Sequence, residues 1–586
     1  MATTKVEDEH VETSSAIDTI QPKGRVGEEV LDSHIHDDHG DPHRAALENA
    51  NAAVKVTPDT WAAVAIPVSV SIAVELQGSV ANVNWMSAGW SLAGSISFAV
   101  AGQLSDFFGR NDIIRAAQAL LILGHLIGAS AQGINQMFAA MAILGAGTGT
   151  AFVGFASISE LLPNKYRPYG LASCELQLLL TSTFGPLCAR ALVQNTALGW
   201  RWIFIIGEIC AIIATTGCAI FYKPPHRVFA DRSKTQLFKE LDYLGIFLYT
   251  AGVTLILLAF GWAGTRYTWS SAAVITPLVI GVVLFSCSFI WGLSGRPARP
   301  LFPSRLFKMY REFLLLLMVI FTTGLAHITL GVYVPQEISY TFTTDPIKAG
   351  LYNIPNGFAG VVGGVILGAY VHKMKRIPLQ LFVGNAVQTI FCGLLALITP
   401  DRIPMALVFQ LIAGTPFGWL TLICYLTAGL HVAQRDLGLA YGLVGSFRFL
   451  GGAVGSTIFN TILRNRVAVD VPNRVTDAIS SLDFDTTQVP ALIQALGSKN
   501  PAQLAEFPAD VVQLGAEGLR WGYSDAFSYV WLASIPFGVI ACVISFFVVD
   551  PSPYFTNHTA VHSRKEAIGK HTEEDVTYAE KRPENK

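Results

Sequence analysis

The amino-acid sequence predicts an all-α integral membrane protein, and three observations support this fold class. Hydrophobic residues make up 52% of the 586 residues and charged residues only 14%, whereas about 25% of an average soluble domain is charged. Apolar runs of about 20 residues, long enough to cross a bilayer, recur from Trp90 almost to the C-terminus. Every backbone polar group in lipid must be paired within its own segment, so these runs are expected to be helices.

Thirteen apolar segments are predicted to span the membrane: 84–105, 113–131, 135–160, 170–194, 201–222, 243–263, 273–293, 312–334, 346–371, 380–398, 403–430, 437–463 and 527–549. A fourteenth segment, 61–81, is incomplete, because its apolar stretch ends at Val74 and Pro67, Glu75 and Gln77 interrupt it. Either this first helix is truncated, or about 20 residues of a full span are missing from the sequence.

The distribution of Lys and Arg predicts the orientation of the chain. Short loops alternate between basic and basic-poor along the whole sequence, and basic loops face the cytoplasm. With the 106–112 loop in the cytoplasm, both termini are cytoplasmic and 464–525 is an extracellular loop. We expect no cleavable signal and a multi-pass protein of the plasma membrane.

The polar ends of the chain, 1–60 and 550–586, are predicted to be cytoplasmic tails, the first of them disordered. The first tail holds a histidine-rich run that includes His34, His36, His39 and His43. Such a run is a compositional signal only, so we expect a solvated tail and no metal site. All eight cysteines lie inside predicted spans, so no disulfide framework is expected.

Several local motifs point to one family. GQLSDFFGRNDIIR (102–115) lies between two spans, and ELLPNKYRPYG (160–170), FGPLCAR (184–190), ELDYLG (240–245) and GSFRFLGGAVGSTIF (445–459) follow. The chain resembles the fourteen-span drug:proton antiporter branch of the major facilitator superfamily, and within it the fungal trichothecene efflux pumps, a family that also contains siderophore-iron transporters.

This resemblance implies two six-helix bundles with two extra central helices. The expected division is an N-terminal bundle at 61–225, a linker with the two extra helices at 226–295, and a C-terminal bundle at 312–549 that includes the 464–525 loop. It also implies a substrate site between the bundles, near the middle of the membrane.

The 102–112 loop is predicted to be a conformational latch. Gly102 and Gly109 let two helices approach and turn sharply, while Asp106 and Arg110 pair with charges and helix ends of the opposite bundle in one state only. The family pattern has basic residues at two further positions, which are Phe107 and Asn111 here, so this latch carries fewer cations. The alternative is a tight turn with a surface ion pair.

Gly185 and Pro186 resemble the antiporter motif of the fifth span. Proline breaks the backbone hydrogen-bond ladder, and glycine permits a bend or close packing. The next two glycines of the pattern are Ala189 and Arg190 here, so the match is partial. The alternative is an ordinary structural kink.

Ionisable residues inside spans are costly and are functional candidates by default. The main candidates for proton coupling are Glu175, Arg448 and His327, and a buried structural Glu–Arg contact is the alternative. Candidates for a ligand pathway are Tyr333, Gln336, Asn353 and Asn356, although aromatic belts at the membrane interface give a similar composition.

The function expected from these features is proton-coupled export of hydrophobic or amphipathic small molecules, such as terpenoid toxins or drugs, by alternating access. The alternatives are a siderophore-iron:proton importer and a non-transporting membrane receptor. No phosphate-binding or nucleophile motif indicates an enzyme or an ATP-driven pump. The expected partners are a small-molecule substrate, protons and the lipid bilayer, with no cofactor and no nucleic acid.

Overall fold

The computed structural model describes residues 80–221, 239–263, 267–433, 436–480, 482, 484–498 and 501–556. Residues 61–79 of the incomplete segment, the tail 1–60 with its histidines, and residues 557–586 of the other tail lie outside the described residues. Within the described part the secondary structure is helical apart from two isolated bridges, which confirms the all-α class. Eleven of the described helices are long and apolar enough to cross a membrane.

The first half of the chain contains seven described helices: α4 (Val80–Phe108), α5 (Arg110–Ala129), α6 (Ile134–Ala151), α7 (Val153–Leu161), α8 (Arg167–Gln177), α9 (Leu179–Asn195) and α10 (Arg201–Phe221). Two predicted spans are not among the eleven. One is 84–105, which lies in α4, a continuous helix with many small and polar residues, and the other is 170–194, which breaks at Leu178 into α8 and α9.

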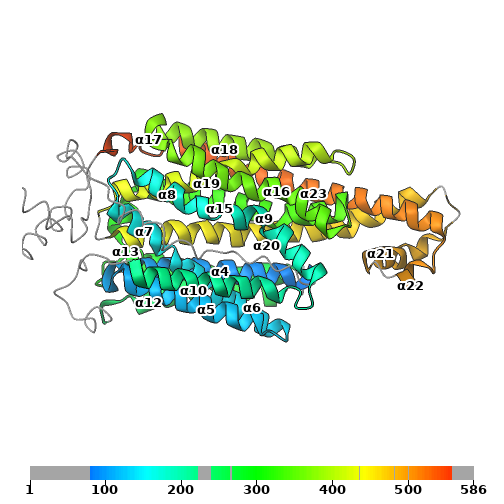
Figure 1. Cartoon of the computed structure of the whole chain (residues 1–586), viewed down its shortest axis with the longest axis horizontal. Helices are drawn as coiled ribbons and strands as arrows, with labels where there is room; N and C mark the ends of the chain where they lie inside the picture. The colour runs from blue at the N-terminus through cyan, green and yellow to red at the C-terminus, as the bar shows by residue number, and fades with distance from the viewer. Residues whose placement is uncertain are drawn as a thin grey trace, which may run out of the picture.

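The second half is a sequence of long helices with short helical turns: α14 (Ser304–Lys308), η2 (Tyr310–Leu314), α15 (Leu315–Glu337), η3 (Ile338–Phe342), α16 (Pro346–Val362), η4 (Gly363–Leu367), α17 (Val371–Met374), α18 (Ile377–Leu394), η5 (Leu395–Leu397), α19 (Ile403–His431), α20 (Leu437–Ile479), η7 (Thr486–Gln488), α21 (Val489–Ser498), α22 (Pro501–Leu504), α23 (Ala509–Ser545) and η8 (Ser552–Tyr554). In Figure 1, α4, α5, α6 and α10 form one layer, and α16, α18, α19 and α23 form another.

The two layers meet along two helix pairs. Helix α4 packs along α20, and α9 packs along α16. The approach is very close, because a Cβ atom built on Gly357 of α16 would overlap the backbone carbonyl of Ser182 in α9. Transmembrane helices that approach this closely need small residues at the contact.

A separate helix pair, α12 (Tyr243–Trp262) and α13 (Ala272–Leu293), joins the two halves in sequence. Asp242 begins α12, accepts hydrogen bonds from the backbone of Gly245 (2.8 Å) and from the indole of Trp291 (2.8 Å), and so ties the two helices together. Tyr249 of α12 reaches the α4–α20 contact, where its hydroxyl lies 2.5 Å from that of Ser446 and 3.3 Å from that of Ser95.

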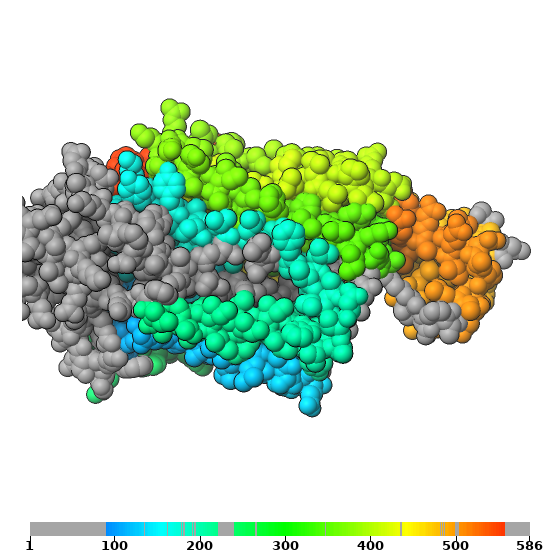
Figure 2. Space-filling model, viewed as in Figure 1, coloured from blue at the N-terminus to red at the C-terminus, as the bar shows by residue number. Residues whose placement is uncertain are grey.

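The described part of 464–525, the segment expected to be an extracellular loop, is largely helical. Helix α20 continues to Ile479, α23 begins at Ala509, and α21 and α22 lie between them. Val471, Val475 and Ile479 recur every four residues along α20 and bury against α21 and α23, which is the spacing of an amphipathic helix. This projecting unit (464–525, orange) stands beyond the other helices (Figures 1 and 2).

Candidate functional site

The centre of the candidate site is Arg448 of α20. Its guanidinium lies 5.2 Å from the ring centroid of Phe152, 5.6 Å from that of Phe417 and 5.2 Å from that of Phe449, distances typical of cation–π contacts. A guanidinium has five N–H donors. No acceptor among the described residues forms a hydrogen bond or ion pair with any of them. Arg448 is therefore a half-buried cation in contact with three aromatic rings.

Glu175 of α8 is the carboxylate of this site. It is 4% exposed, and its side chain packs against Gly364 of η4, where a built Cβ atom would lie 3.2 Å from the Glu175 Cγ atom. The charge of Arg448 acts on Glu175, yet no ion pair within 4 Å joins Glu175 to another described residue. Glu175 thus lies where the first half of the chain meets the second.

His327 of α15 completes the set of charged or ionisable groups. Its imidazole stacks on the ring of Phe417, with 3.3 Å between the centroids and 7° between the planes, and the charge of Arg448 acts on it as well. The three candidates for proton coupling come from three different helices, and the structure brings them to one place. Their role in coupling stays a prediction.

Two buried hydroxyls of the same site were not predicted from the sequence. Thr421 and Tyr425 are fully buried on α19, and neither hydroxyl oxygen has a hydrogen-bond partner among the described residues. They are four residues apart, so they lie on one face of the helix. A buried hydroxyl without a partner costs about 1–3 kcal/mol. The i, i+4 spacing of two polar residues in an apolar helix was the available sequence signal.

The latch residue Asp106 binds the start of α20. Its carboxylate accepts hydrogen bonds from the backbone N–H groups of Gly438 (3.0 Å) and Leu439 (2.8 Å), and a negative charge is stabilised at a helix N-terminus. Arg110 lies 2.7 Å from the same carboxylate. The loop between α4 and α5 is thereby joined to the second half of the chain.

Arg110 extends this network within the first half. It is bound to Glu160 of α7 and donates to Ser105 Oγ, two partners that the sequence analysis did not assign. Gly109 has a φ of 92°, which favours glycine, and a Cβ on Gly102 would overlap the carbonyl oxygen of Gly438. These contacts join the loop between α4 and α5 to the start of α20. The role of this loop as a conformational latch stays a prediction.

Gly185 and Pro186 lie inside α9. A Cβ built on Gly185 would have no atom within 4 Å, so close packing is not the reason for a glycine here. The interruption of the predicted fifth span lies instead at Leu178, between α8 and α9. Any bend at Pro186 remains a prediction.

The four ligand-pathway candidates lie in different surroundings. Tyr333 is fully buried and donates its hydroxyl to the carbonyl oxygen of Ser456 (2.6 Å), so this tyrosine is a satisfied core residue. Asn356 donates weakly to Leu330 (3.4 Å), and Gln336 is half-buried on α15. Asn353 is 5% exposed, and its Oδ1 has no partner among the described residues.

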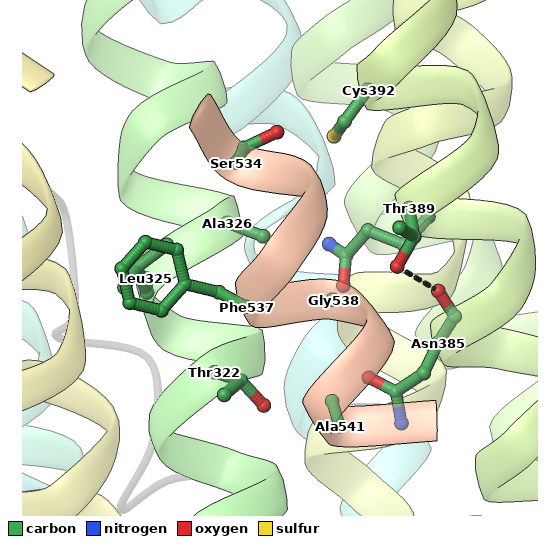
Figure 3. Close-up of a pocket in the computed structure, with 11 residues that line it drawn as sticks. Thr322, Leu325, Ala326, Asn385, Thr389, Cys392, Ser534, Phe537, Gly538 and Ala541 are labelled. Carbon is green, nitrogen blue, oxygen red and sulfur yellow. Dashed lines mark hydrogen bonds between the residues drawn. The ribbon is translucent and has the colours of Figure 1, made fainter. Parts of the chain in front are cut away.

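A small cavity lined by polar and apolar side chains lies within the second half of the chain (Figure 3). Thr322 of α15, Asn385 and Thr389 of α18 and Ser534 of α23 line it, with a free volume of about 20 Å³. Thr389 donates to the carbonyl oxygen of Asn385 (2.7 Å). This volume suits about one water molecule and is too small for a drug-sized substrate. In the described part of the chain no group of three or more His, Cys, Asp or Glu side chains is arranged to hold a metal ion.

Comparisons with known proteins agree with one another. The family model described as the fungal trichothecene efflux pump (TRI12) matches residues 52–581. The trichothecene efflux pump TRI12 of Fusarium sporotrichioides is 27% identical over 505 residues, 84% of each chain. The MFS-type transporter prx5 of Penicillium rubens is 27% identical over 448 residues, which are 75% of this chain and 81% of that one.

Two solved structures are also similar. The proton:xylose symporter XylE matches with a TM-score of 0.46 and 16% identity, over 88% of this chain and 95% of that chain. The human organic anion transporter MFSD10 matches with a TM-score of 0.48 and 13% identity, over 88% of this chain and all of that chain.

Proposed function

Because the chain belongs to the fungal trichothecene efflux pump family, whose members are transporters of the major facilitator superfamily, we propose that it exports hydrophobic or amphipathic small molecules in exchange for protons. Terpenoid toxins are the proposed substrate class, because the relative from Fusarium sporotrichioides is a trichothecene efflux pump. The proposed location is the plasma membrane, with both termini in the cytoplasm.

One observation carries the proton-coupling part of this proposal: Glu175 is buried between the two halves of the chain, within the field of Arg448, and no ion pair neutralises it in the described part of the chain. Burial disfavours the charged form of a carboxylate in that position, because the charge loses its hydration, unless a nearby cation or a bound proton compensates. Proton binding to Glu175 removes its charge and weakens its attraction to Arg448. The two forms therefore favour different arrangements of α8 and α20.

The transport cycle that we propose exposes this site to one side of the membrane at a time. The bundles proposed at 61–225 and 312–549 rock about the central site, and the linker at 226–295 joins them. In the arrangement described above, the Asp106 contact with the start of α20 holds one end closed. Substrate and proton occupy the site in alternation, so the inward flow of protons drives export.

The test is transport by purified protein in proteoliposomes with an imposed pH gradient. Wild-type protein is expected to accumulate a labelled trichothecene against its concentration gradient, and Glu175→Gln is expected to lose this accumulation while it retains exchange of substrate without a gradient. Glu208→Gln, which changes another intramembrane carboxylate, is the matched control and keeps accumulation.

Three outcomes contradict the proposal. Full gradient-driven accumulation by Glu175→Gln excludes Glu175 as the proton carrier. Gradient-driven movement of a ferric siderophore, with no flux of trichothecene, means that the protein transports siderophores and does not export toxins. No flux of any tested compound through correctly folded protein supports a receptor.

A further inference from the structure

The hydroxyl of Tyr425 is a buried donor without a partner, and its surroundings are specific. The ring is held on two sides, by stacking on Phe155 of α7 (centroids 5.0 Å apart) and by an edge contact with Tyr441 of α20 (5.3 Å). The side chain is fully buried, and its oxygen has no hydrogen bond to any described residue. Packing thus fixes the ring and leaves the polar atom unsatisfied.

The titratable groups around the Tyr425 hydroxyl include one strong hydrogen-bond acceptor. The groups that act electrostatically on its hydroxyl are Arg448, Glu175, Tyr441 and Cys424. A guanidinium only donates, and a thiol is a weak acceptor. The Tyr441 hydroxyl is already 2.7 Å from Ser159 Oγ. Glu175 is the strong acceptor in this set.

The other groups around Glu175 do not compete with it as the acceptor for the Tyr425 hydroxyl. From α20 it faces Arg448, which is a cation, and η4 brings only Gly363–Leu367, which hold no titratable side chain. His327 of α15 is stacked on Phe417. The carboxylate of Glu160 in α7 is bound by Arg110.

We infer that Tyr425 donates its phenolic O–H to the carboxylate of Glu175 when Glu175 is deprotonated, and is therefore a positioning residue for the proton carrier. The inference rests on the proposed function. The phenol keeps its own proton throughout, and the proton that enters or leaves is the one on Glu175. In the arrangement described above the bond is not formed, so it distinguishes one step of the cycle from another.

The experiment is a double-mutant cycle on the purified full-length protein in proteoliposomes, with a labelled trichothecene as the probe. Tyr425→Phe keeps the ring and removes the donor. It is expected to lower gradient-driven transport about tenfold, the effect of one hydrogen bond to a charged group, and to leave gradient-free exchange within about twofold. In a Glu175→Gln background it is expected to cause no further loss, because the charged acceptor is already absent. Tyr523→Phe, at a half-buried tyrosine stacked on Tyr340 outside this site, is the matched control.

A second pair of variants tests the inference in case Tyr425→Phe does not fold. Tyr425→Gln and Tyr425→Met have side chains of similar size, and only Gln offers an N–H donor. We expect Gln to retain more gradient-driven transport than Met. Equal transport by the two variants, or an unchanged rate in Tyr425→Phe, overturns the inference, as does an equal loss from Tyr425→Phe with and without Glu175. If Glu175→Gln itself keeps gradient-driven transport, the proton site of the proposed function is wrong instead.

Discussion

Replacing Asp106 by Asn should weaken the closed arrangement of the latch. The carboxylate accepts two backbone hydrogen bonds at the start of α20, of 3.0 and 2.8 Å, and lies 2.7 Å from Arg110. Hydrogen bonds to charged groups contribute about 1.5–3 kcal/mol each, and an Asn oxygen still accepts one of them. The loss is therefore about 2–4 kcal/mol, which changes the ratio of closed to open forms roughly 30- to 1,000-fold.

The assay is a distance measurement between spin labels on the two sides of this junction. Lys165 and Met374 are exposed positions in the first and second halves, near the ring contact of Tyr169 with His372, and cysteines at both sites carry the labels. We expect the Asp106→Asn protein to populate a longer distance that the parent protein hardly populates. Asp485→Asn, in the projecting unit, is the control.

One result would refute this reasoning. If Asp106→Asn leaves both the distance distribution and the rate of transport unchanged, the contact with α20 either persists in every state or contributes nothing. The loop at 102–112 is then a static turn, which is the alternative to a latch that the sequence allows.

Three further predictions concern the contacts around the central site. Gly102→Ala places a methyl group against the carbonyl oxygen of Gly438 and is expected to lower the melting temperature and to favour the open form, which thermal unfolding and the same spin labels measure. Tyr249→Phe removes the hydroxyl that lies 2.5 Å from that of Ser446, and we expect a loss of about 1 kcal/mol in the stability of the closed form. An unchanged population of the closed form contradicts a role of α12 in stabilising the α4–α20 contact. Arg448→Gln removes the cation between three rings and is expected to reduce gradient-driven transport at least tenfold, whereas Arg466→Gln, a change at a similar Arg–Tyr contact near the projecting unit, leaves transport unchanged.

The ionisable part of the central site was predictable from the sequence because charges are rare in apolar helices. Glu175, His327 and Arg448 each stand out in an otherwise apolar run, and the cost of burying them makes a chance occurrence improbable. That they meet is a property of the packing of α8, α15 and α20 and has no signature in spacing. Tyr425 was missed although it lies four residues after Thr421, because a tyrosine is ordinary in a helix core until its hydroxyl is seen to lack a partner.

The errors in the fold have local physical causes. The break at Leu178 has no glycine or proline at that position, so propensity favours a continuous helix and only tertiary contacts interrupt it. In the 464–525 segment, Val471, Val475 and Ile479 of α20 recur at a spacing of four residues, which is the period of an amphipathic helix.

Helix α20 also couples two distant parts of the protein mechanically. It is a single helix of 43 residues, roughly 65 Å long at 1.5 Å per residue, with Asp106 bound at its first turn and the projecting unit built on its last. A rod of this length converts a tilt of a few degrees at the latch into a displacement of several ångströms at its far tip. A binder of the projecting unit is therefore expected to shift the contact between Asp106 and the start of α20, and is a means of trapping one arrangement of the helices.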